Sequence, residues 1–306
     1  MSDMAYEPSG IMGQQIFGLP VDRKILFSNH KKIYKKRIEK RQRKLIIKLP
    51  FLKTFLKRGE HILLITTGYS PLGSLAQYVT GFVFVYLKRS LFVFTNRRIL
   101  HVPTTPSYQY KGAVSQIPYS GCQSIALKGG TLIVEYGNFG KLETFKGIPV
   151  AERKKIKALL AKVPKSGTKG DTAERKHLCP RCTHLLDAGK YTCGNCQLKF
   201  KNKLLARIIA IIIPGGGYFY TRHYMLGCLN AVLEGFLLFY IGYIILSLTR
   251  AQNDSQESIF LLIILGAVFL ILKIIAVIHS SHFIDEFIPR NKKFKPTRAR
   301  KARQKQ

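Results

Sequence analysis

Two long apolar runs towards the C-terminal end dominate the hydrophobic pattern of this chain. Residues 225–248 and residues 259–278 are almost uninterrupted series of apolar side chains. Crossing about 30 Å of bilayer hydrocarbon takes about 20 helical residues, so each run is long enough. A soluble core helix of that length would show a polar face at a period of 3.6 residues, and neither run does. The pattern predicts transmembrane helices over residues 225–248 and 259–279, paired as a hairpin.

A third apolar run, which begins at residue 204, is only about half as long as a span. It carries Arg207 and ends at Pro214 and three glycines, which break or kink a helix. Residues 204–224 are therefore expected to form a short kinked, re-entrant or in-plane segment. The PGGGYFY sequence in this segment resembles the turn of small bacterial two-span membrane modules with a PG-x-G…FY signature.

Basic residues flank the apolar block on both sides. The tail, residues 285–306, holds nine Lys and Arg residues, and four more lie at positions 199–207, whereas residues 249–258 hold one Arg and two acids. The positive-inside rule places both basic flanks in the cytosol and the connection outside. This favours two crossings over three, in a bacterial-type inner (plasma) membrane, with the N-terminal domains and the tail cytosolic.

Each run contains one charged side chain. Glu234 lies 14 residues before the end of the first run, and Lys273 lies 14 residues after the start of the second. In a hairpin the two residues reach nearly the same depth, and charges in a bilayer usually pair or face a cavity. We expect an interhelical Glu234–Lys273 contact. The alternatives are that Lys273 reaches the interface alone, or that the two charges line a proton or ion pathway.

The N-terminal part is polar up to residue 22, where we expect disorder, and strongly basic over residues 23–58. Apolar residues are interleaved with the basic ones, which predicts an amphipathic helical arm on an anionic leaflet. The alternatives are a basic helix that covers the next domain, or a nucleic-acid contact. The candidate lipid- or polyanion-binding residues of this arm are Lys31, Lys32, Lys35, Lys36, Arg37, Lys40, Arg41, Arg43 and Lys44.

Residues 59–163 have strand character. Several short β-rich segments, among them residues 81–86, are separated by glycine-rich turns such as residues 137–140, and an amphipathic helix follows from residue 150. The pattern predicts a small β-barrel closed by a C-terminal helix.

This region resembles the bacterial pleckstrin-homology-like (PH-like, or GRAM) domains. The resemblance is carried by GEHILL at residues 59–64 and LFVFTNRRIL at residues 91–100. It implies a fold similar to phosphoinositide-binding modules, although such bacterial domains more often look like protein-interaction or oligomerising domains. Arg97 and Arg98 are candidates for binding a lipid phosphate. The alternative for Arg98 is a salt bridge within the sheet.

After a linker at residues 164–176, residues 177–200 contain the strongest local signal. Cys179 and Cys182 form one CxxC pair, and Cys193 and Cys196 form a second pair ten residues later. Four cysteines in this spacing can hold one tetrahedral zinc ion, and the segment resembles a zinc ribbon. With four protein ligands no position stays open for water, so the zinc is expected to be structural. A redox role for the cysteines is the competing interpretation.

The net charge of +34 and pI of about 10.1 point to polyanionic partners, either an anionic membrane surface or nucleic acid. Residues 1–18 lack a basic stretch followed by an apolar core, so we expect no signal peptide and cytosolic N-terminal domains.

Together these patterns predict a multidomain α+β membrane protein with a PH-like small β-barrel, a zinc ribbon and a transmembrane hairpin. We expect a non-catalytic adaptor that binds anionic lipids or a protein partner, because no catalytic set of residues stands out. A membrane-tethered nucleic-acid-binding protein and a small transporter or channel subunit are the alternatives. Self-association of the chain is also left open.

Overall fold

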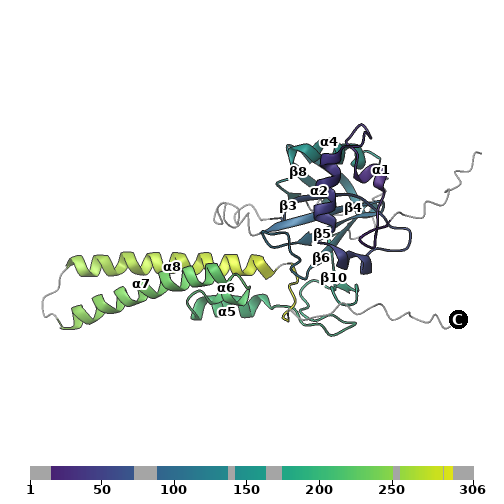
Figure 1. Ribbon diagram of the computed structural model, residues 1–306. Coiled ribbons are helices and arrows are strands. Elements are labelled where there is room, and N and C mark those ends of the chain that lie inside the picture. Colours follow the sequence, from purple (N-terminus) through teal and green to yellow (C-terminus); the bar gives the residue numbers. More distant parts are fainter. Residues whose placement is uncertain are drawn as a thin grey trace, which may run out of the picture. The chain divides into compact units, whose positions relative to one another are not determined.

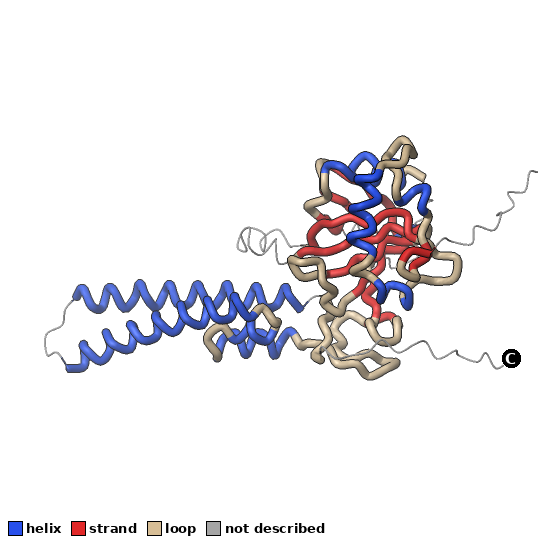
Figure 2. Tube along the Cα trace, viewed as in Figure 1, coloured by secondary structure: helices blue, strands red, loops and turns tan. Residues whose placement is uncertain are grey.

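The computed structural model describes residues 15–71, 88–136, 142–162, 174–250, 256–284 and 286–291. The chain divides into two compact units, which are described separately. The first, here called the sheet unit, comprises Met1–Pro71, Tyr86–Leu198 and Asn291–Gln306, and the second, the helical unit, comprises Leu72–Val85 and Lys199–Arg290. All described strands belong to the sheet unit (Figure 2). The strand expected at residues 81–86, the turn at 137–140, most of the linker and most of the basic tail lie outside the described residues.

The sheet unit contains three antiparallel sheets, and two of them, with six and three strands, make up most of it (Figure 1). The six-stranded sheet has the order β11-β10-β6-β5-β4-β3 and the three-stranded sheet has the order β7-β8-β9. The strands of the larger sheet are β3 (Ile62–Tyr69), β4 (Arg89–Thr95), β5 (Arg98–Pro103), β6 (Val114–Pro118), β10 (Lys176–Leu178) and β11 (Leu185–Leu186). Those of the smaller sheet are β7 (Cys122–Lys128), β8 (Thr131–Tyr136) and β9 (Leu142–Phe145).

The expected closed barrel is not found among the described strands. The short helix η2 (Tyr119–Gly121) turns the chain after β6, and the next strand, β7, starts a separate sheet instead of extending the first. What the structure shows is therefore a mixed α+β unit in which the two larger sheets are separate.

Both faces of the six-stranded sheet are buried, as the side chains of β4 illustrate. Leu91 and Val93 belong to one apolar cluster, whereas Phe92 and Phe94 belong to another on the opposite face. A strand that is buried on both faces reads as a continuous apolar run, which explains the LFVF sequence. The first cluster also contains side chains of α1 (Arg23–Leu26), α2 (Lys36–Ile46) and η1 (Pro50–Thr54), and the second contains side chains of the three-stranded sheet and α4 (Val150–Leu160).

The outer strand β3 has its backbone groups satisfied by a side chain of α2. Ile65 N donates to Gln42 Oε1 at 3.0 Å, and Gln42 Nε2 donates to Ile65 O at 2.8 Å. The buried carboxamide thus stands in for one residue of a neighbouring strand. The hairpin of β1 (Gln15–Ile16) and β2 (Leu19–Pro20) leads into a bridge between Val21 and Ile62, which covers the start of the same edge. An exposed edge would be a site for unwanted pairing with other chains.

The helical unit consists of α5 (Lys203–Ile212), α6 (Gly216–Tyr220), α7 (Tyr224–Arg250) and α8 (Gln256–Ile284) (Figure 1). The helices α7 and α8 are long and apolar enough to cross a membrane. In the most apolar 18-residue stretch of each helix, only 11% is buried. Large apolar side chains such as Phe239 and Leu270 are 75% and 61% exposed. The two helices therefore present apolar surface that water would not favour.

A sharp turn at Gly215 separates α5 from α6. Gly215 has a φ of +67°, and a Cβ atom there would lie 2.2 Å from the carbonyl oxygen of Gly227, so only glycine fits. After the turn the chain runs back, because Tyr220 Oη at the end of α6 accepts from the backbone N–H of Asn202, the N-cap of α5, at 3.1 Å. The path from residue 202 to residue 220 therefore begins and ends at the same level.

Candidate metal centre and polar sites

The four predicted cysteine ligands lie together in the sheet unit. Their sulfur atoms are all within 4.8 Å of one another. Cys179 Sγ lies 3.5 Å from Cys196 Sγ, and Cys182 Sγ lies 3.6 Å from Cys193 Sγ. A zinc ion bound at about 2.3 Å by four sulfurs would space them about 3.8 Å apart. The cluster can therefore hold a metal ion, and the donor set and spacing fit zinc.

The two CxxC turns have the same backbone structure. Cys179 N donates to the carbonyl oxygen of His184 at 2.8 Å, and Cys193 N donates to the carbonyl oxygen of Leu198 at 2.9 Å. In both turns the acceptor lies five residues after the cysteine. The fourth residue after each of these cysteines has a left-handed backbone: Thr183 has a φ of 61° and Gln197 a φ of 56°. Burial raises the pKa of the Cys179 thiol, and backbone N–H groups of Cys182 and Arg181 oppose that shift. Such donors stabilise thiolates, the form that binds metal.

Gly194, inside the second CxxC pair, does not have a conformation that requires glycine. It is absent from the residues with positive φ, and a Cβ atom added to it would meet no atom within 4 Å. The left-handed positions at Thr183 and Gln197 carry the turn geometry instead, and no glycine signal marks them.

The cysteine cluster is joined to the larger sheet. Leu178, directly before the first ligand, pairs with Val114 of β6 and lies in the core of that face. Arg175 bridges the two sheets, because its Nε lies 3.3 Å from a carboxylate oxygen of Glu143 on β9 and its Nη1 lies 3.3 Å from Ser115 Oγ on β6. The segment that carries the four cysteines is thus continuous with the sheet unit.

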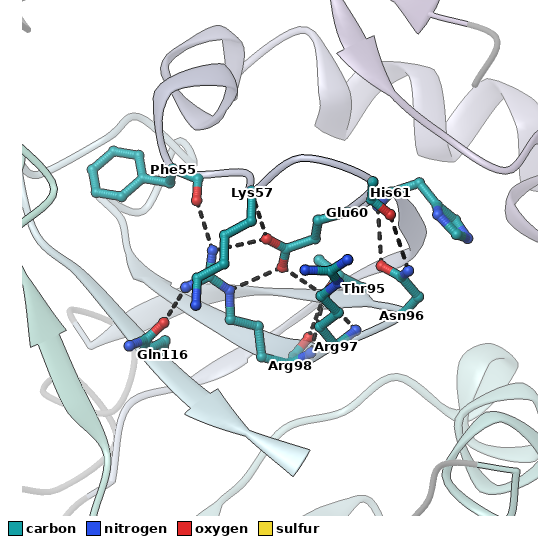
Figure 3. A network of polar contacts seen from close by, with 10 residues as sticks. Phe55, Lys57, Glu60, His61, Thr95, Asn96, Arg97, Arg98 and Gln116 are labelled. Carbon is teal, nitrogen blue, oxygen red and sulfur yellow. Dashed lines mark hydrogen bonds and ion pairs between the residues drawn. The ribbon is translucent and has the colours of Figure 1, made fainter. Parts of the chain in front are cut away.

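Arg98 is not available to a lipid phosphate. Its side chain is buried against Glu60, with Arg98 Nε to Glu60 Oε1 at 2.9 Å and Arg98 Nη2 to Glu60 Oε2 at 2.8 Å (Figure 3). Nη2 also donates to the carbonyl oxygen of Phe55 at 2.6 Å, and Nη1 donates to Gln116 Oε1. The guanidinium is fully used within the fold, so the salt-bridge alternative describes this arginine.

Glu60 is held ionised by its surroundings. Burial alone would raise the pKa of this carboxyl, but hydrogen bonds from Arg98, from the backbone N–H of Lys57 and from Thr95 outweigh burial and hold the pKa below its ordinary value of 4.5. The carboxylate joins the loop after η1 to the start of β5. Glu60 of the GEH sequence and Arg98 of the NRR sequence thus link these two segments, and this contact is called the Glu60–Arg98 clamp below.

Arg97, by contrast, is exposed and lies beside this clamp together with Lys57 (Figure 3). Its Nη2 would be 3.4 Å from a Cβ atom built on Gly59. Of the two predicted arginines, only Arg97 points its charge at solvent.

Helix α2 of the basic arm has a buried apolar side and an exposed charged side, whereas Ile33, Tyr34 and Ile47 beside this helix are exposed. Gln42, Leu45 and Ile46 of α2 are buried in the sheet unit. The apolar side of this helix is therefore not free to insert into a leaflet. The basic residues that stay exposed and have no acidic partner among the residues described are Lys31, Lys32, Lys35, Lys36, Arg37, Lys40 and Lys44.

The other two basic residues of the set are paired. Arg41 Nε lies 3.2 Å from Glu152 Oε1 of α4, and Arg43 Nε lies 2.7 Å from Glu39 Oε1 one turn back on α2. On a helical wheel Lys36, Lys40 and Lys44 occupy one face, because they are four residues apart. This face, together with Arg37, is called the α2 cationic face below.

The structure also reveals a buried histidine network that the sequence did not suggest. His101 Nε2 lies 3.0 Å from the hydroxyls of Ser70 and Ser90, and His101 Nδ1 lies 3.0 Å from Ser115 Oγ. These residues are far apart in sequence and come together only through strand pairing. A Ser–His contact resembles part of a hydrolase site, so the position of the histidine proton decides its chemistry.

Arg175 determines that proton position. Its Nη1 lies 3.3 Å from His101 Nδ1, and a guanidinium can only donate, so Nδ1 accepts and the ring proton is on Nε2. Nε2 then donates to a serine hydroxyl and cannot remove a proton from it. On the Nε2 side, the histidine therefore cannot act as a general base toward Ser70 or Ser90.

In the helical unit, Glu234 and Lys273 lie in contact. Lys273 Nζ is 3.0 Å from Glu234 Oε2, and both side chains are largely buried. Glu234 also accepts from the backbone N–H of Gly215 at 3.1 Å and from Asn230 Nδ2 at 2.8 Å, and Lys273 donates to the carbonyl oxygen of Ala210 at 3.2 Å. The last carbonyls of α5 and the first N–H of the turn have no helical partner of their own. The ion pair thus satisfies backbone groups on both sides of the break between α5 and α6.

A scan of the sequence against protein-family models finds no match, and a search of the curated proteins finds no similar protein. The function is therefore inferred from the residues and geometry of the chain itself.

Proposed function

We propose that the protein is a non-catalytic adaptor anchored in a membrane by α7 and α8, whose sheet unit binds the anionic leaflet and a protein partner. The observation that carries this proposal is the state of α2. Its apolar side is used inside the fold, so the only surface that it offers is charge. Each basic residue near an anionic leaflet contributes about 1 kcal/mol. Because the chain is anchored elsewhere, this attraction orients the sheet unit rather than recruiting it.

The strand order supports a PH-like identity for the sheet unit. Four consecutive antiparallel strands, β3 to β6, are followed by the three strands β7 to β9 and then by the helix α4. This is the succession implied by the resemblance of GEHILL and TNRRIL to the bacterial PH-like domains. Those domains more often look like protein-interaction modules, which is why we include a protein partner.

The cysteine cluster is proposed to be a structural zinc site of the zinc-ribbon type. Its residues Cys179, Cys182, Cys193 and Cys196 supply four ligands, which leaves no open position for water. Zinc would stabilise a small segment that has little core of its own. Metal analysis of the purified protein is expected to give one zinc per chain, and loss of all metal binding only in a variant with the cysteines replaced would support the assignment.

We place the sheet unit and the basic tail in the cytosol of a bacterial-type cell. The basic residues at positions 199–207 and 290–305 flank the two helices, whereas the connection between them carries little positive charge. The return of α6 to the start of α5 supports two crossings, with α5 and α6 entering and leaving from one side.

The full-length protein, inserted in nanodiscs of neutral or of partly anionic lipid, tests the proposed surface. Lysine acetylation followed by mass spectrometry measures the accessibility of Lys36, Lys40 and Lys44. We expect these lysines to be protected from acetylation in anionic nanodiscs at low salt. The protection should be lost near 1 M salt, because the attraction between exposed charges then reaches only about 3 Å. The exposed lysines Lys154 and Lys157 of α4 are the matched internal control.

Equal acetylation of the α2 cationic face in both kinds of nanodisc would contradict leaflet binding. Adding RNA separates the alternative partner: preferential protection by RNA, with a steep salt dependence, would favour a membrane-tethered nucleic-acid-binding protein. The triple variant Lys36→Gln, Lys40→Gln, Lys44→Gln should abolish whichever protection is seen.

A further inference from the structure

Helix α5 combines an exposed apolar surface with a cation. Leu204, Ile208 and Ile211 are 64%, 43% and 58% exposed, although α5 packs on its neighbours through Ala206 and Ala210. Arg207 lies among these residues and is exposed as well. It is five residues after the N-cap, which places it about 7 Å along the helix. A cation at that depth needs an anionic or hydrated partner.

The contacts of Arg207 fix its place beside α8. Arg207 Nε donates to Ser281 Oγ at 3.0 Å, and this is its only hydrogen bond among the described residues. One turn further along α5, the carbonyl oxygen of Ala210 accepts from Lys273 of α8 at 3.2 Å. The two helices therefore run antiparallel. Neither terminal nitrogen of Arg207 has an acceptor among the residues that the structure describes, so both can bind an acceptor from outside the chain.

Further cations gather at the end of the helical unit where α5 begins. Arg290 N donates to the carbonyl oxygen of Lys199 at 2.9 Å, and Arg222 Nη2 donates to the carbonyl oxygen of Arg290 at 2.6 Å. Lys199 and Arg290 are exposed. The nearest described acid in the sequence, Glu286, is 6% exposed. This end of the unit is therefore basic.

The surface beyond Arg207 is apolar on both helices. Ile211 follows Arg207 by one turn of α5, and Ile274 precedes Ser281 by two turns of α8 on the same helical face. Both isoleucines are at least half exposed, at 58% and 50%. A cation at one end and an apolar path leading away from it match the two parts of a phospholipid.

We propose that α5 and the adjoining side of α8 form a binding site for one anionic glycerophospholipid. The lipid phosphate is bound by Arg207, with Lys199, Arg222 and Arg290 supplying further positive charge, and an acyl chain lies along Ile211 and Ile274. The proposal rests on the membrane insertion of α7 and α8 in the proposed function, but not on the α2 cationic face. A free phosphate would use the cations and leave the apolar path unused.

Native mass spectrometry of the full-length protein in detergent tests this site. The protein is titrated with phosphatidylglycerol, phosphatidylcholine or glycerol phosphate, and bound adducts are counted. We expect retention of phosphatidylglycerol and weak binding of the other two. Arg207→Gln should weaken the phosphatidylglycerol affinity about tenfold or more, since charge-assisted hydrogen bonds to phosphate are strong. Arg207→Lys should keep part of the affinity.

Two controls separate this proposal from the proposed function. Lys190→Gln removes an exposed cation of the sheet unit, and the triple α2 variant removes the leaflet-facing charge; neither should change the adduct. Equal binding of phosphatidylglycerol and phosphatidylcholine, or unchanged affinity in Arg207→Gln, would overturn the lipid site. Equal binding of glycerol phosphate would show a plain phosphate site. Release of the wild-type protein from membranes by alkaline carbonate would instead contradict the anchor itself.

Discussion

Each of the two units has a buried ion pair among its described residues, and both pairs satisfy backbone groups, although their surroundings differ. Arg98 Nη2 lies 2.8 Å from Glu60 in the sheet unit, and Lys273 Nζ lies 3.0 Å from Glu234 in the helical unit. Each acid also accepts from a backbone N–H, and each base also donates to a backbone carbonyl. In both places the charges satisfy backbone groups that a break in regular structure has left without partners.

The difference lies in what surrounds the groups when the pair is lost. Around Arg98 and Glu60, local opening lets water reach the released backbone groups. Around Glu234 and Lys273 the neighbouring surface is apolar, and a bilayer offers no water to replace a lost hydrogen bond. Replacing a buried ion pair by apolar side chains is often neutral or stabilising. Where backbone groups depend on the pair, as they do here, the same replacement would leave those groups without partners. The comparison teaches that the importance of a buried pair depends on the backbone groups that it satisfies.

Exchanging the charges of the helical unit should have the largest effect. In the double variant Glu234→Lys, Lys273→Glu the attraction persists, but the introduced ammonium would face the N–H of Gly215 and the introduced carboxylate would face the carbonyl oxygen of Ala210. Donor then meets donor and acceptor meets acceptor, so we expect no rescue relative to either single variant. The yield of monodisperse protein in detergent measures this. Recovery to the wild-type yield would show that the pair is a simple charge attraction.

Removing one partner in the sheet unit should rank second. Arg98→Leu leaves Glu60 charged and buried, and breaking a buried pair in this way destabilises by about 3–5 kcal/mol. Denaturant unfolding of the sheet unit in the full-length protein, followed by circular dichroism, measures the change. The matched control is Lys190→Gln, which breaks the exposed Lys190–Asp187 pair and should change stability by less than about 1 kcal/mol. Equal effects of the two variants would contradict the clamp.

A neutral side chain allows the comparison to be made without charge. Gln42→Leu keeps the volume of the buried residue and removes both hydrogen bonds to Ile65. Leaving buried backbone groups unpaired should destabilise by about 1–3 kcal/mol. The same denaturant assay applies, and Gln42→Glu adds a test of geometry, since a carboxylate can accept from the N–H but cannot donate to the carbonyl. A stabilised Gln42→Leu protein would refute the role assigned to the carboxamide.

Acidification should produce the smallest and most gradual effect. Because the pKa of Glu60 is held below its ordinary value of 4.5, its contribution to stability is present above that value and is lost as pH falls through the lowered pKa. Burial raises the pKa of Glu152, which acts in the opposite direction. The difference in stability between wild type and Glu60→Gln should therefore shrink below about pH 4. A constant difference from pH 3 to pH 7 would contradict this.

Some features follow from sequence because a local signal defines them. The CxxC spacing predicts the cluster of Cys179 and its three partners, and the long apolar runs predict two helices able to span a membrane; the structure confirms both at this level. The α+β character of the N-terminal part is likewise confirmed. A closed barrel is not found among the described strands, and the short turn η2 that leads from β6 into the sheet of β7 carries no strong sequence pattern.

Other features depend on partners far away in the chain. Nothing local shows that Arg98 faces Glu60, 38 residues earlier, while its neighbour Arg97 faces solvent. The apolar residues of α2 suggest a membrane contact equally well as a core contact, and only the sheet beside them decides. Strand β10 is three residues long and polar at Lys176, so its pairing with β6 is set by tertiary structure rather than by propensity.

The position of β10 bears on how the protein is made. A ribosome adding about 5–20 residues each second completes β6 several seconds before β10 emerges. During that interval the edge of β6 is open, and a nascent chain with an open edge can pair wrongly. Closing the edge waits for a segment whose folding, under the proposed structural zinc site, depends on four cysteines. The supply of metal to the newly made chain would then decide how long that vulnerable interval lasts.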